Sequence, residues 1–419
     1  MRENRGIFYR IDWVLVGIYL ALVIAGWLNI YAAVYDESHH HIFDLSQKYG
    51  KQMIFILAAF LLALGTLIID PKFFSQFSYF IYGFFLFFLI LVIFSGREIS
   101  GSKGWFAIGG FGIQPAEFAK MATCLALAKY LSALDVDIRK FSNLVIASLI
   151  ILAPTLIVFL QHDTGSAIVF FALVLVLYRA GLSGYVPLTI IILPALAILS
   201  LLVPKLLLTG CLLVMALIAL FFIKRRLKNI LIIILVFLAS TGFVFSVDYG
   251  VNHILEKHQR DRIYVLVGQE IDLKGAGYNV NQSLIAIGSG RFFGKGFLQG
   301  TQTKYNFVPE QSTDFIFCTI GEEQGFLGSS LLVILYVFLF IRIILSAEKQ
   351  RSRFARFYGY GVASVLFFHF AINIGMTLGL LPVIGIPLPF VSYGGSSLWA
   401  FTLLLFIFIR QDSYRHELI

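Results

Sequence analysis

The sequence predicts an all-α polytopic integral membrane protein with about 12 transmembrane helices, and three observations lead to this fold class. First, 59% of the 419 residues are hydrophobic and only 13% are charged, which is too much apolar surface for a water-soluble protein to bury. Second, apolar runs long enough to cross a bilayer recur along the chain. Third, basic residues gather in short tracts beside these runs, so the net charge of +9 indicates membrane topology and not nucleic-acid binding.

The apolar runs define the predicted spans, since a helix needs about 20 apolar residues to cross a bilayer. The first run starts near Trp13, after a basic segment, and is long enough to be a transmembrane helix and not the core of a signal peptide. Only Pro204 and Lys205 separate the seventh run from the eighth. The predicted spans are residues 13–34, 52–69, 76–95, 114–133, 142–160, 164–181, 185–203, 206–223, 229–247, 314–343, 357–380 and 393–410.

The basic tracts predict which loops face the cytoplasm. With the N-terminus inside, the tracts at 224–228 and 348–356 and the C-terminal tail all fall inside. Removing one span would put these two tracts on opposite sides of the membrane, so an even number of spans is favoured. The loops then predicted to lie outside are residues 35–51, 96–113, 161–163, 204–205, 248–313 and 381–392.

The outer loop at 248–313 is far longer than an ordinary connection, so we expect it to be functional or structured. Residues 251–267 have the apolar spacing of a short amphipathic helix at the membrane interface. We find no separate soluble domain and no repeat, and therefore predict a single transmembrane domain over 1–419. A second apolar stripe within the loop is formed by Val280, Leu284 and Ile287.

Ionisable residues at membrane depth are costly and often mark a working site. Glu117 and Lys120 open the fourth span three residues apart, and therefore share a helix face. They can serve a polar cavity, or they can form an internal ion pair that holds helices together. Asp163 begins the sixth span, where it can serve the site or cap the helix.

Carboxylates also crowd the start of the tenth span, at Glu310, Asp314, Glu322 and Glu323. A solvated helix cap is the alternative interpretation of Asp314. Three histidines at 39–41 in the first outer loop have the composition of a metal site, but a solvated loop is the favoured interpretation.

Asp272 lies in the long outer loop and has two interpretations. It can be a turn residue before Gly275 and Gly277. However, the segment that follows is rich in glycine, which allows a backbone to approach a ligand closely. This segment and its surroundings also carry positive charge, which predicts an externally open site for an anionic, lipid-borne substrate. The basic residues concerned are Lys274, Arg291, Lys295 and Lys304.

Five motifs along the chain are similar to those of the SEDS proteins of bacterial cell-wall synthesis. They are GAGYNVNQSLIAIGSG, FGKGFLQGTQT, FVPEQSTDFIF, GEEQG and PLPFVSYGGSS. The resemblance covers nearly the whole chain, and the form of the second motif resembles the elongation members of the family more than the division members. The family has ten spans, so an extra hairpin around 185–226 accounts for the other two and leaves the 248–313 loop outside.

The resemblance implies a peptidoglycan glycosyltransferase that polymerises lipid II, an undecaprenyl-pyrophosphate disaccharide-pentapeptide, for cell elongation and rod shape. It implies a location in the bacterial cytoplasmic membrane, with polymerisation at the outer face and both termini in the cytoplasm. It also implies a partner, a class B penicillin-binding protein transpeptidase that crosslinks the new glycan.

The resemblance also assigns site residues. Asp272 matches the position of the catalytic aspartate. Two departures lie in the second outer loop, where Gly104 stands in place of the arginine that many relatives have before Trp105, and Gly112 stands in place of a basic residue. The implied substrate-binding residues are Lys103, Trp105, Glu117, Lys120, Asp163, Gln282, Ser283, Lys295, Glu310, Thr313, Asp314, Glu322, Ser392 and Tyr393.

The implied reaction gives Asp272 a role. A sugar hydroxyl must attack an anomeric carbon while pyrophosphate leaves, and a carboxylate can take the hydroxyl proton as general base. Inversion at that carbon requires a single displacement with one base. Lysine, arginine or a divalent cation such as Mg²⁺ or Mn²⁺ can stabilise the leaving group, but the sequence shows no clear metal motif.

Two other functions are compatible with the same sequence. Many spans and buried charges also suit a lipid II flippase, and a third possibility is a non-catalytic scaffold for the transpeptidase. Transporters often have inverted repeats and polar residues near the midplane. The lack of a repeat and the outer position of the polar residues favour the enzyme.

Overall fold

The computed structural model describes residues 10–35, 42–99, 102–108, 111–224, 226–253, 276–305 and 307–415. The chain divides into two compact units, Met1–Leu182 with Asn279–Ile419, and Ser183–Tyr278. Each unit is described by itself. The two units are distinguished by which residues contact one another. This division does not test the prediction of a single transmembrane domain over 1–419.

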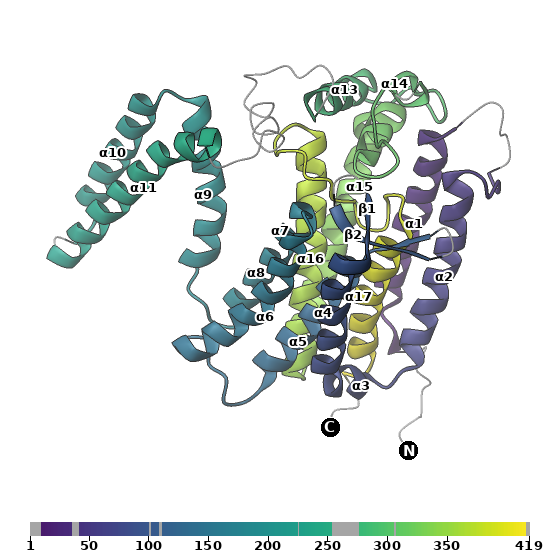
Figure 1. The fold of residues 1–419 in the computed structure, drawn as a ribbon, viewed down its shortest axis with the longest axis horizontal. Coiled ribbons are helices and arrows are strands. Elements are labelled where there is room, and N and C mark those ends of the chain that lie inside the picture. Colours follow the sequence, from purple (N-terminus) through teal and green to yellow (C-terminus); the bar gives the residue numbers. More distant parts are fainter. Residues whose placement is uncertain are drawn as a thin grey trace. The chain divides into compact units, whose positions relative to one another are not determined.

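The first unit is a bundle of long helices (Figure 1). α5 lies inside it and packs against α4, α6, α16 and α17, while α15 packs against α1 and α16. The helices of this unit are α1 (Trp13–Ala33), α2 (Lys48–Ile68), α3 (Pro71–Gln76), α4 (Ser78–Ser95), α5 (Pro115–Ser132), α6 (Phe141–Leu160), α7 (Thr164–Val169), the 3-10 helix η2 (Phe170–Leu173), α8 (Val174–Arg179), α13 (Ala276–Ser289), α14 (Thr301–Lys304), α15 (Ile316–Glu348), α16 (Arg353–Thr377) and α17 (Gly395–Ser413).

The helices confirm the predicted helical polytopic membrane protein. Within the described residues, nine helices are long and apolar enough to cross a membrane. The other three predicted spans are also helical, as α5, the run from α7 to α8, and α17. Polar side chains lower the hydropathy of α5 and α17, and the run from α7 to α8 is short. The count of twelve spans therefore stays a prediction.

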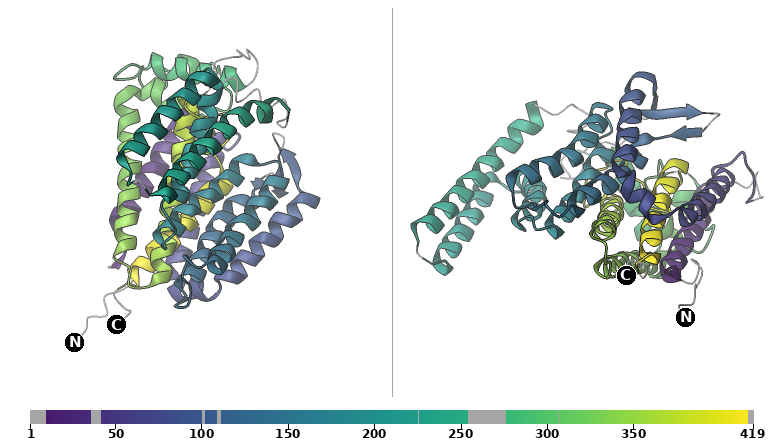
Figure 2. Two further views of the ribbon diagram at one scale, coloured as in Figure 1. Left: turned by 90° about the vertical axis from the view of Figure 1, so that its left-hand side faces the viewer. Right: turned by 90° about the horizontal axis from the view of Figure 1, so that it is seen from below.

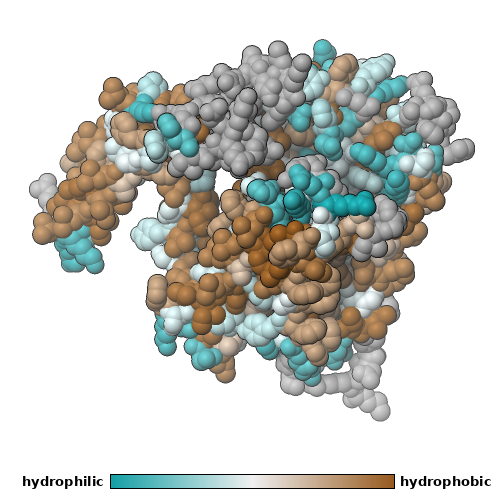
Figure 3. Space-filling view, in the orientation of Figure 1, coloured by the Kyte–Doolittle hydropathy of each residue, from teal (hydrophilic) through white to brown (hydrophobic). Residues whose placement is uncertain are grey.

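The surface of the first unit agrees with a membrane environment. In the face shown in Figure 3, apolar side chains cover the middle of the helices and polar side chains gather toward their ends. Leu57, Phe80 and Phe94 are examples of large apolar side chains that are more than half exposed. Such exposure is unfavourable in water and favourable against lipid.

A small antiparallel sheet follows α4, in a loop for which the sequence analysis predicted no strands. Its strands are β1 (Arg97–Ile99), β2 (Ser102–Ile108) and β3 (Phe111–Ile113), in the order β1-β2-β3. β2 contacts α4, and the strands project beside this helix (Figure 2). The sheet positions Lys103 and Trp105 at one end of the bundle.

Polar contacts tie the helices together at the end of the bundle where α1 begins and α17 ends (Figure 1). Asp12 caps α1 and accepts a hydrogen bond from Arg342 Nε of α15 at 2.8 Å. Arg410 Nε of α17 donates to the Ile69 carbonyl at 2.9 Å. The first contact joins α1 to α15, and the second joins α17 to the end of α2.

The opposite end of the bundle carries α13 and α14 (Figures 1 and 2). The sequence predicted that Val280, Leu284 and Ile287 form the apolar stripe of α13. Leu284 is instead 43% exposed, and the buried positions are Ser283, Ala286 and Gly290. Gly290 is buried because α13 ends against the backbone of α15.

The second unit consists of α9 (Tyr185–Leu202), α10 (Lys205–Phe222) and α11 (Leu227–His253). α10 packs on α11, and α11 packs on α9. The sequence predicted two separate helices on either side of Pro204, and the structure confirms them. Val203 is extended, as a residue before proline prefers, and Pro204 precedes the first turn of α10.

Substitutions at two glycines test the contact between α13 and α15. A Cβ at Gly290 would lie 1.9 Å from the Gly321 carbonyl oxygen, whereas a Cβ at Gly288 would meet nothing within 4 Å. We expect Gly290→Ala to lower the free energy of unfolding by about 1–3 kcal/mol, because the backbones must separate. Thermal unfolding in detergent measures this effect. Gly288→Ala is the matched control and should be neutral or stabilising, since alanine favours helix; equal melting temperatures for the two variants would contradict the contact.

Candidate functional site

The segment at 381–394, between α16 and α17, connects many of the predicted site residues. Ser392 Oγ donates to the Thr313 carbonyl at 2.6 Å, and the Tyr393 amide donates to the Ser312 carbonyl at 2.9 Å. Asn373 Nδ2 of α16 donates to the Ile386 carbonyl at 2.7 Å and to the Asp314 carbonyl at 2.8 Å. The residues before α15 and the segment before α17 therefore form one hydrogen-bonded wall.

Three carboxylates lie at this wall. Asp314 is partly buried, and a Cβ at Gly385 would lie 3.3 Å from its Oδ2. Burial, together with the negative charges of Glu310 and Asp163, raises the pKa of Asp314 to about 7. Glu310 is exposed and accepts a hydrogen bond from Thr313 Oγ1 at 2.9 Å. The site thus holds a carboxyl group that exchanges its proton near neutral pH.

Asp314 is not a helix cap, contrary to the alternative interpretation of the sequence. Phe315 occupies the cap position of α15, and no side chain caps that helix. Asp163, in contrast, does cap α7, since its Oδ1 accepts from the Ser166 amide at 2.9 Å. Its second oxygen accepts from Gln114 Nε2 at 2.7 Å. Asp163 is therefore held in a fixed orientation by two elements.

Glu117 and Lys120 form a buried ion pair inside the bundle, as one interpretation of their spacing predicted. Lys120 Nζ lies 2.7 Å from Glu117 Oε1, and both residues are nearly inaccessible. The ammonium group also lies 2.9 Å from Nε2 of His369 on α16 and 5.8 Å from the centre of the Phe401 ring on α17. The pair thus connects α5 with α16 and α17.

Glu322 and Lys295 form an ion pair with each other, so neither side chain points freely into an open cavity. Lys295 Nζ donates to Glu322 Oε1 at 2.6 Å and to Thr301 Oγ1 at 2.7 Å. Glu322 is fully buried and also accepts from the amides of Thr301, Gln302 and Thr303 at 2.7, 2.9 and 2.9 Å. This carboxylate therefore anchors α14 to α15 and has its acceptor sites filled by the protein.

The remaining predicted residues lie on α13 and β2. Ser283 is buried and donates to the Thr377 carbonyl at 3.0 Å, which fastens α13 to the end of α16, and Gln282 is partly buried beside it. Lys103 has an exposed side chain, and its amide donates to the Gln161 carbonyl at 3.1 Å. Trp105 packs on Gly112, where a Cβ would lie 3.0 Å from the ring.

The structure adds residues that sequence reasoning missed. Lys48 begins α2, donates to Ser312 Oγ at 3.0 Å and lies 5.8 Å from the centre of the Tyr393 ring. Gln52, one turn later, accepts from the Gly394 amide at 3.2 Å. His369 and Asn373 lie inside a predicted span, where polar residues are rare, and this signal could have identified them.

Three predictions lie wholly or mostly outside the described residues. Asp272 and the three histidines at 39–41 belong to parts of the chain that the structure does not describe. Most of the predicted amphipathic helix at 251–267 lies there too. Within the described ranges, no group of three His, Cys, Asp or Glu residues could hold a metal ion.

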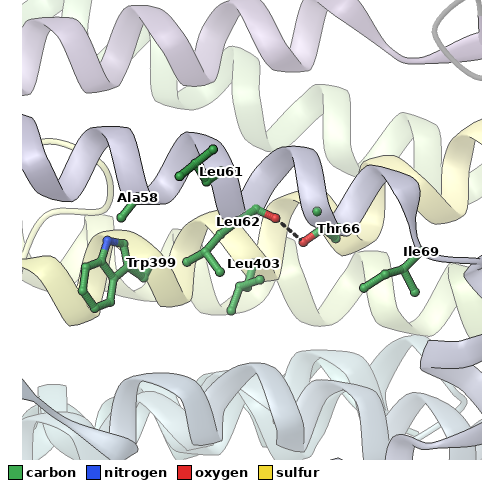
Figure 4. A pocket seen from close by; sticks show the side chains of 8 residues that line it. Ala58, Leu61, Leu62, Thr66, Ile69, Trp399 and Leu403 are labelled. Carbon is green, nitrogen blue, oxygen red and sulfur yellow. Dashed lines mark hydrogen bonds between the residues drawn. The ribbon is translucent and has the colours of Figure 1, made fainter.

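A groove of about 570 Å³ lies between α2 and α17, away from the polar wall (Figure 4). Its polar groups are already bonded within the protein. Thr66 Oγ1 donates to the Leu62 carbonyl at 2.7 Å, and Trp399 Nε1 donates to the Phe55 carbonyl at 2.9 Å. The groove therefore presents an apolar surface and lacks the groups that glycosyl transfer requires.

The chain is similar to known proteins over almost its whole length. The model of the FtsW, RodA and SpoVE family, described as "Cell cycle protein", matches residues 12–207 and 178–417. The chain is 33% identical to "Peptidoglycan glycosyltransferase RodA" of Treponema pallidum over 96% of this chain and 98% of that protein. It is 31% identical to "Peptidoglycan glycosyltransferase MrdB" of Escherichia coli K12 over 93% of this chain and 90% of that protein.

Solved structures share the fold. One, described as "Structural coordination of polymerization and crosslinking by a peptidoglycan synthase complex", contains a chain that is 26% identical with a TM-score of 0.71, over 97% of this chain and 99% of that one. The Rod shape determining protein RodA of Thermus thermophilus has a TM-score of 0.63 at 24% identity, over 97% and 98% of the two chains. The second likeness shows the fold alone.

The raised pKa of Asp314 predicts a pH-dependent stability. Between the ordinary pKa of 3.8 and about 7, the folded state keeps a proton that the unfolded chain has lost. The stability that this proton contributes is complete below the lower value and is lost as pH rises through the upper one. We expect Asp314→Asn, which is always neutral, to melt at a higher temperature than wild type at about pH 8 and at a similar temperature at about pH 4.

Melting in detergent across this range measures the difference between the two proteins. Glu310→Gln provides a further check, because removal of this charge should lower the pKa of Asp314 and reduce the difference between wild type and Asp314→Asn. A difference that is the same at every pH would contradict the raised pKa.

Proposed function

The chain belongs to the FtsW/RodA/SpoVE family, whose members are the SEDS proteins, and from this membership we propose that it is a peptidoglycan glycosyltransferase that acts in cell elongation. The observation that carries the proposal is the match, along almost the whole chain, to relatives that bear this name. The reaction is the polymerisation of lipid II into glycan strands.

Asp272 acts as the general base in this proposal. It accepts the proton of the acceptor hydroxyl while that oxygen attacks the anomeric carbon of the donor, and the pyrophosphate leaves from the opposite face. The family motif that follows Asp272 supports the assignment. The contacts of two other carboxylates support it as well. The oxygens of Glu322 already accept hydrogen bonds from protein donors, and Glu117 is held in a buried ion pair.

Described residues have binding roles in the same proposal. Lys48 and Lys103 are exposed residues, and their ammonium groups suit the diphosphate of a lipid-borne substrate. Glu310 and Asp314 carry acceptors that suit sugar hydroxyl groups. Lys295 forms an ion pair with Glu322. Its role in the proposal is therefore to hold the loop before α14 in place, and not to bind phosphate.

A divalent cation, Mg²⁺ or Mn²⁺, remains part of the proposal without assigned ligands. A bound cation would stabilise the charge of the leaving pyrophosphate. Among the residues that the structure describes, no group of three His, Cys, Asp or Glu side chains could hold it, and no step of the mechanism depends on it.

The proposal includes a place and a partner. The protein lies in the bacterial cytoplasmic membrane with both termini in the cytoplasm, as the basic tracts predict. Its partner is a class B penicillin-binding protein that crosslinks the product. The similarity to a chain from a complex in which polymerisation and crosslinking are coordinated supports this partner.

Polymerisation of labelled lipid II tests the function. We expect purified wild type, together with its transpeptidase, to form glycan ladders, and Asp272→Ala to be slower by about 10²–10⁴-fold, which is the usual contribution of a general base. Asp261→Ala, in the same outer loop, is the matched control and should polymerise like wild type.

The other functions make different predictions in this assay. A flippase moves labelled lipid II across a liposome membrane without lengthening glycan, and a scaffold does neither. Equal polymerisation by wild type and a folded Asp272→Ala protein would remove Asp272 from the mechanism. Absence of polymerisation by wild type with its partner would reject the glycosyltransferase itself.

A further inference from the structure

His369 lies at a junction between the buried ion pair and the polar wall. It is fully buried on α16, and its ring packs edge-on against Phe401 with 4.8 Å between ring centres. Its Nε2 lies 2.9 Å from Lys120 Nζ, and its Nδ1 lies 3.2 Å from the carbonyl oxygen of Pro387. Both ring nitrogens therefore face a polar partner in an otherwise apolar environment.

The hydrogen-bonding roles of these partners determine which ring nitrogen of His369 carries the proton. An ammonium group only donates hydrogen bonds, so Nε2 must be an unprotonated acceptor toward Lys120. A carbonyl oxygen only accepts, so Nδ1 must carry a proton toward Pro387. The imidazole is therefore neutral, with its proton on Nδ1. The other tautomer would leave donors facing donors and an acceptor facing an acceptor.

Pro387 belongs to the 381–394 segment that forms the wall of the candidate site. The preceding carbonyl, that of Ile386, accepts from Asn373, which also holds the Asp314 carbonyl. Lys120 has Glu117 Oε1 as its second polar partner, while Glu117 Oε2 is buried without a hydrogen-bond partner. The orientation of the Lys120 ammonium group thus depends on His369 as well as on Glu117.

We propose that His369 is a positioning residue for glycan polymerisation, which as a neutral imidazole accepts from Lys120 and donates to Pro387, and so joins the buried ion pair to the wall of the site. The inference rests on the proposed function and goes beyond it, because it assigns a role to a residue that acts only through others.

Three substitutions separate this role from simple packing. In His369→Gln, the amide oxygen extends about as far as Nε2 and can accept from Lys120. In His369→Asn, the shorter amide can donate to Pro387 but falls short of Lys120. In His369→Phe, the ring still packs against Phe401, but both hydrogen bonds are lost.

We expect His369→Gln and His369→Asn, which each keep one of the two hydrogen bonds, to polymerise lipid II more slowly than wild type, and His369→Phe to be the slowest, by on the order of 10-fold or more, since small misplacements of site groups are costly. All proteins are assayed with the partner transpeptidase, and melting temperatures confirm that they are folded. Wild-type activity in a folded Phe variant would overturn the proposal. A greater loss in the Gln and Asn variants than in the Phe variant, which keeps the packing against Phe401, would do the same.

A second measurement stands independently of activity. The chain has 8 histidines, so the nitrogen NMR signals of His369 in ¹⁵N-histidine-labelled protein are assigned by their loss in His369→Gln. A protonated Nδ1 with an unprotonated Nε2 is expected. A proton on Nε2, or a charged ring, would overturn the inference even if polymerisation is normal. If wild type does not polymerise lipid II, the proposed function fails while the tautomer still tests the hydrogen-bonded arrangement.

Discussion

The Lys120 ammonium group is the charge on which the arrangement of the described bundle depends. A charge buried among apolar helices is tolerated only when it is paired and hydrogen-bonded, because loss of one partner leaves several kcal/mol of desolvation uncompensated. Its three neighbours come from three helices, Glu117 on α5, His369 on α16 and Phe401 on α17. These helices can therefore pack in only one register, and the wall of the candidate site inherits that register through the 381–394 segment.

Local sequence patterns predicted the parts of the site that lie within one helix turn. The spacing of Glu117 and Lys120 indicated a shared face and a possible ion pair, and the position of Asp163 before a helical run indicated a cap; the structure shows both contacts. Contacts between distant residues were not predictable in this way. Lys120 and His369 are 249 positions apart, and no local periodicity brings them together.

The difference between local patterns and long-range contacts also explains which parts of the fold were predictable. Apolar runs predicted the lipid-facing helices well, because exposure to lipid makes every position apolar. Interior helices have less apolar sequences, because they make polar contacts with one another where outer helices face lipid. One example lies at the start of α5 and α17, where the backbone amide of Gln114 donates to Ser396 Oγ at 3.2 Å. The three short strands escaped prediction because the loop at 96–113 is rich in glycine and has no sustained alternation of apolar and polar residues.

The carboxylates near the site divide by what already surrounds them, and this division narrows their possible roles. Glu322 accepts from three backbone amides and a lysine, so protonating it or moving it would release α14 from α15. Asp163 has one oxygen on a helix terminus and the other on Gln114. Asp314 and Glu310 have fewer protein donors, and the pKa of Asp314 lies near neutrality. Among these described carboxylates, those of the second kind can bind or release protons and hydroxyl groups without disturbing the bundle, and a general base at Asp272, as proposed, must meet the same condition.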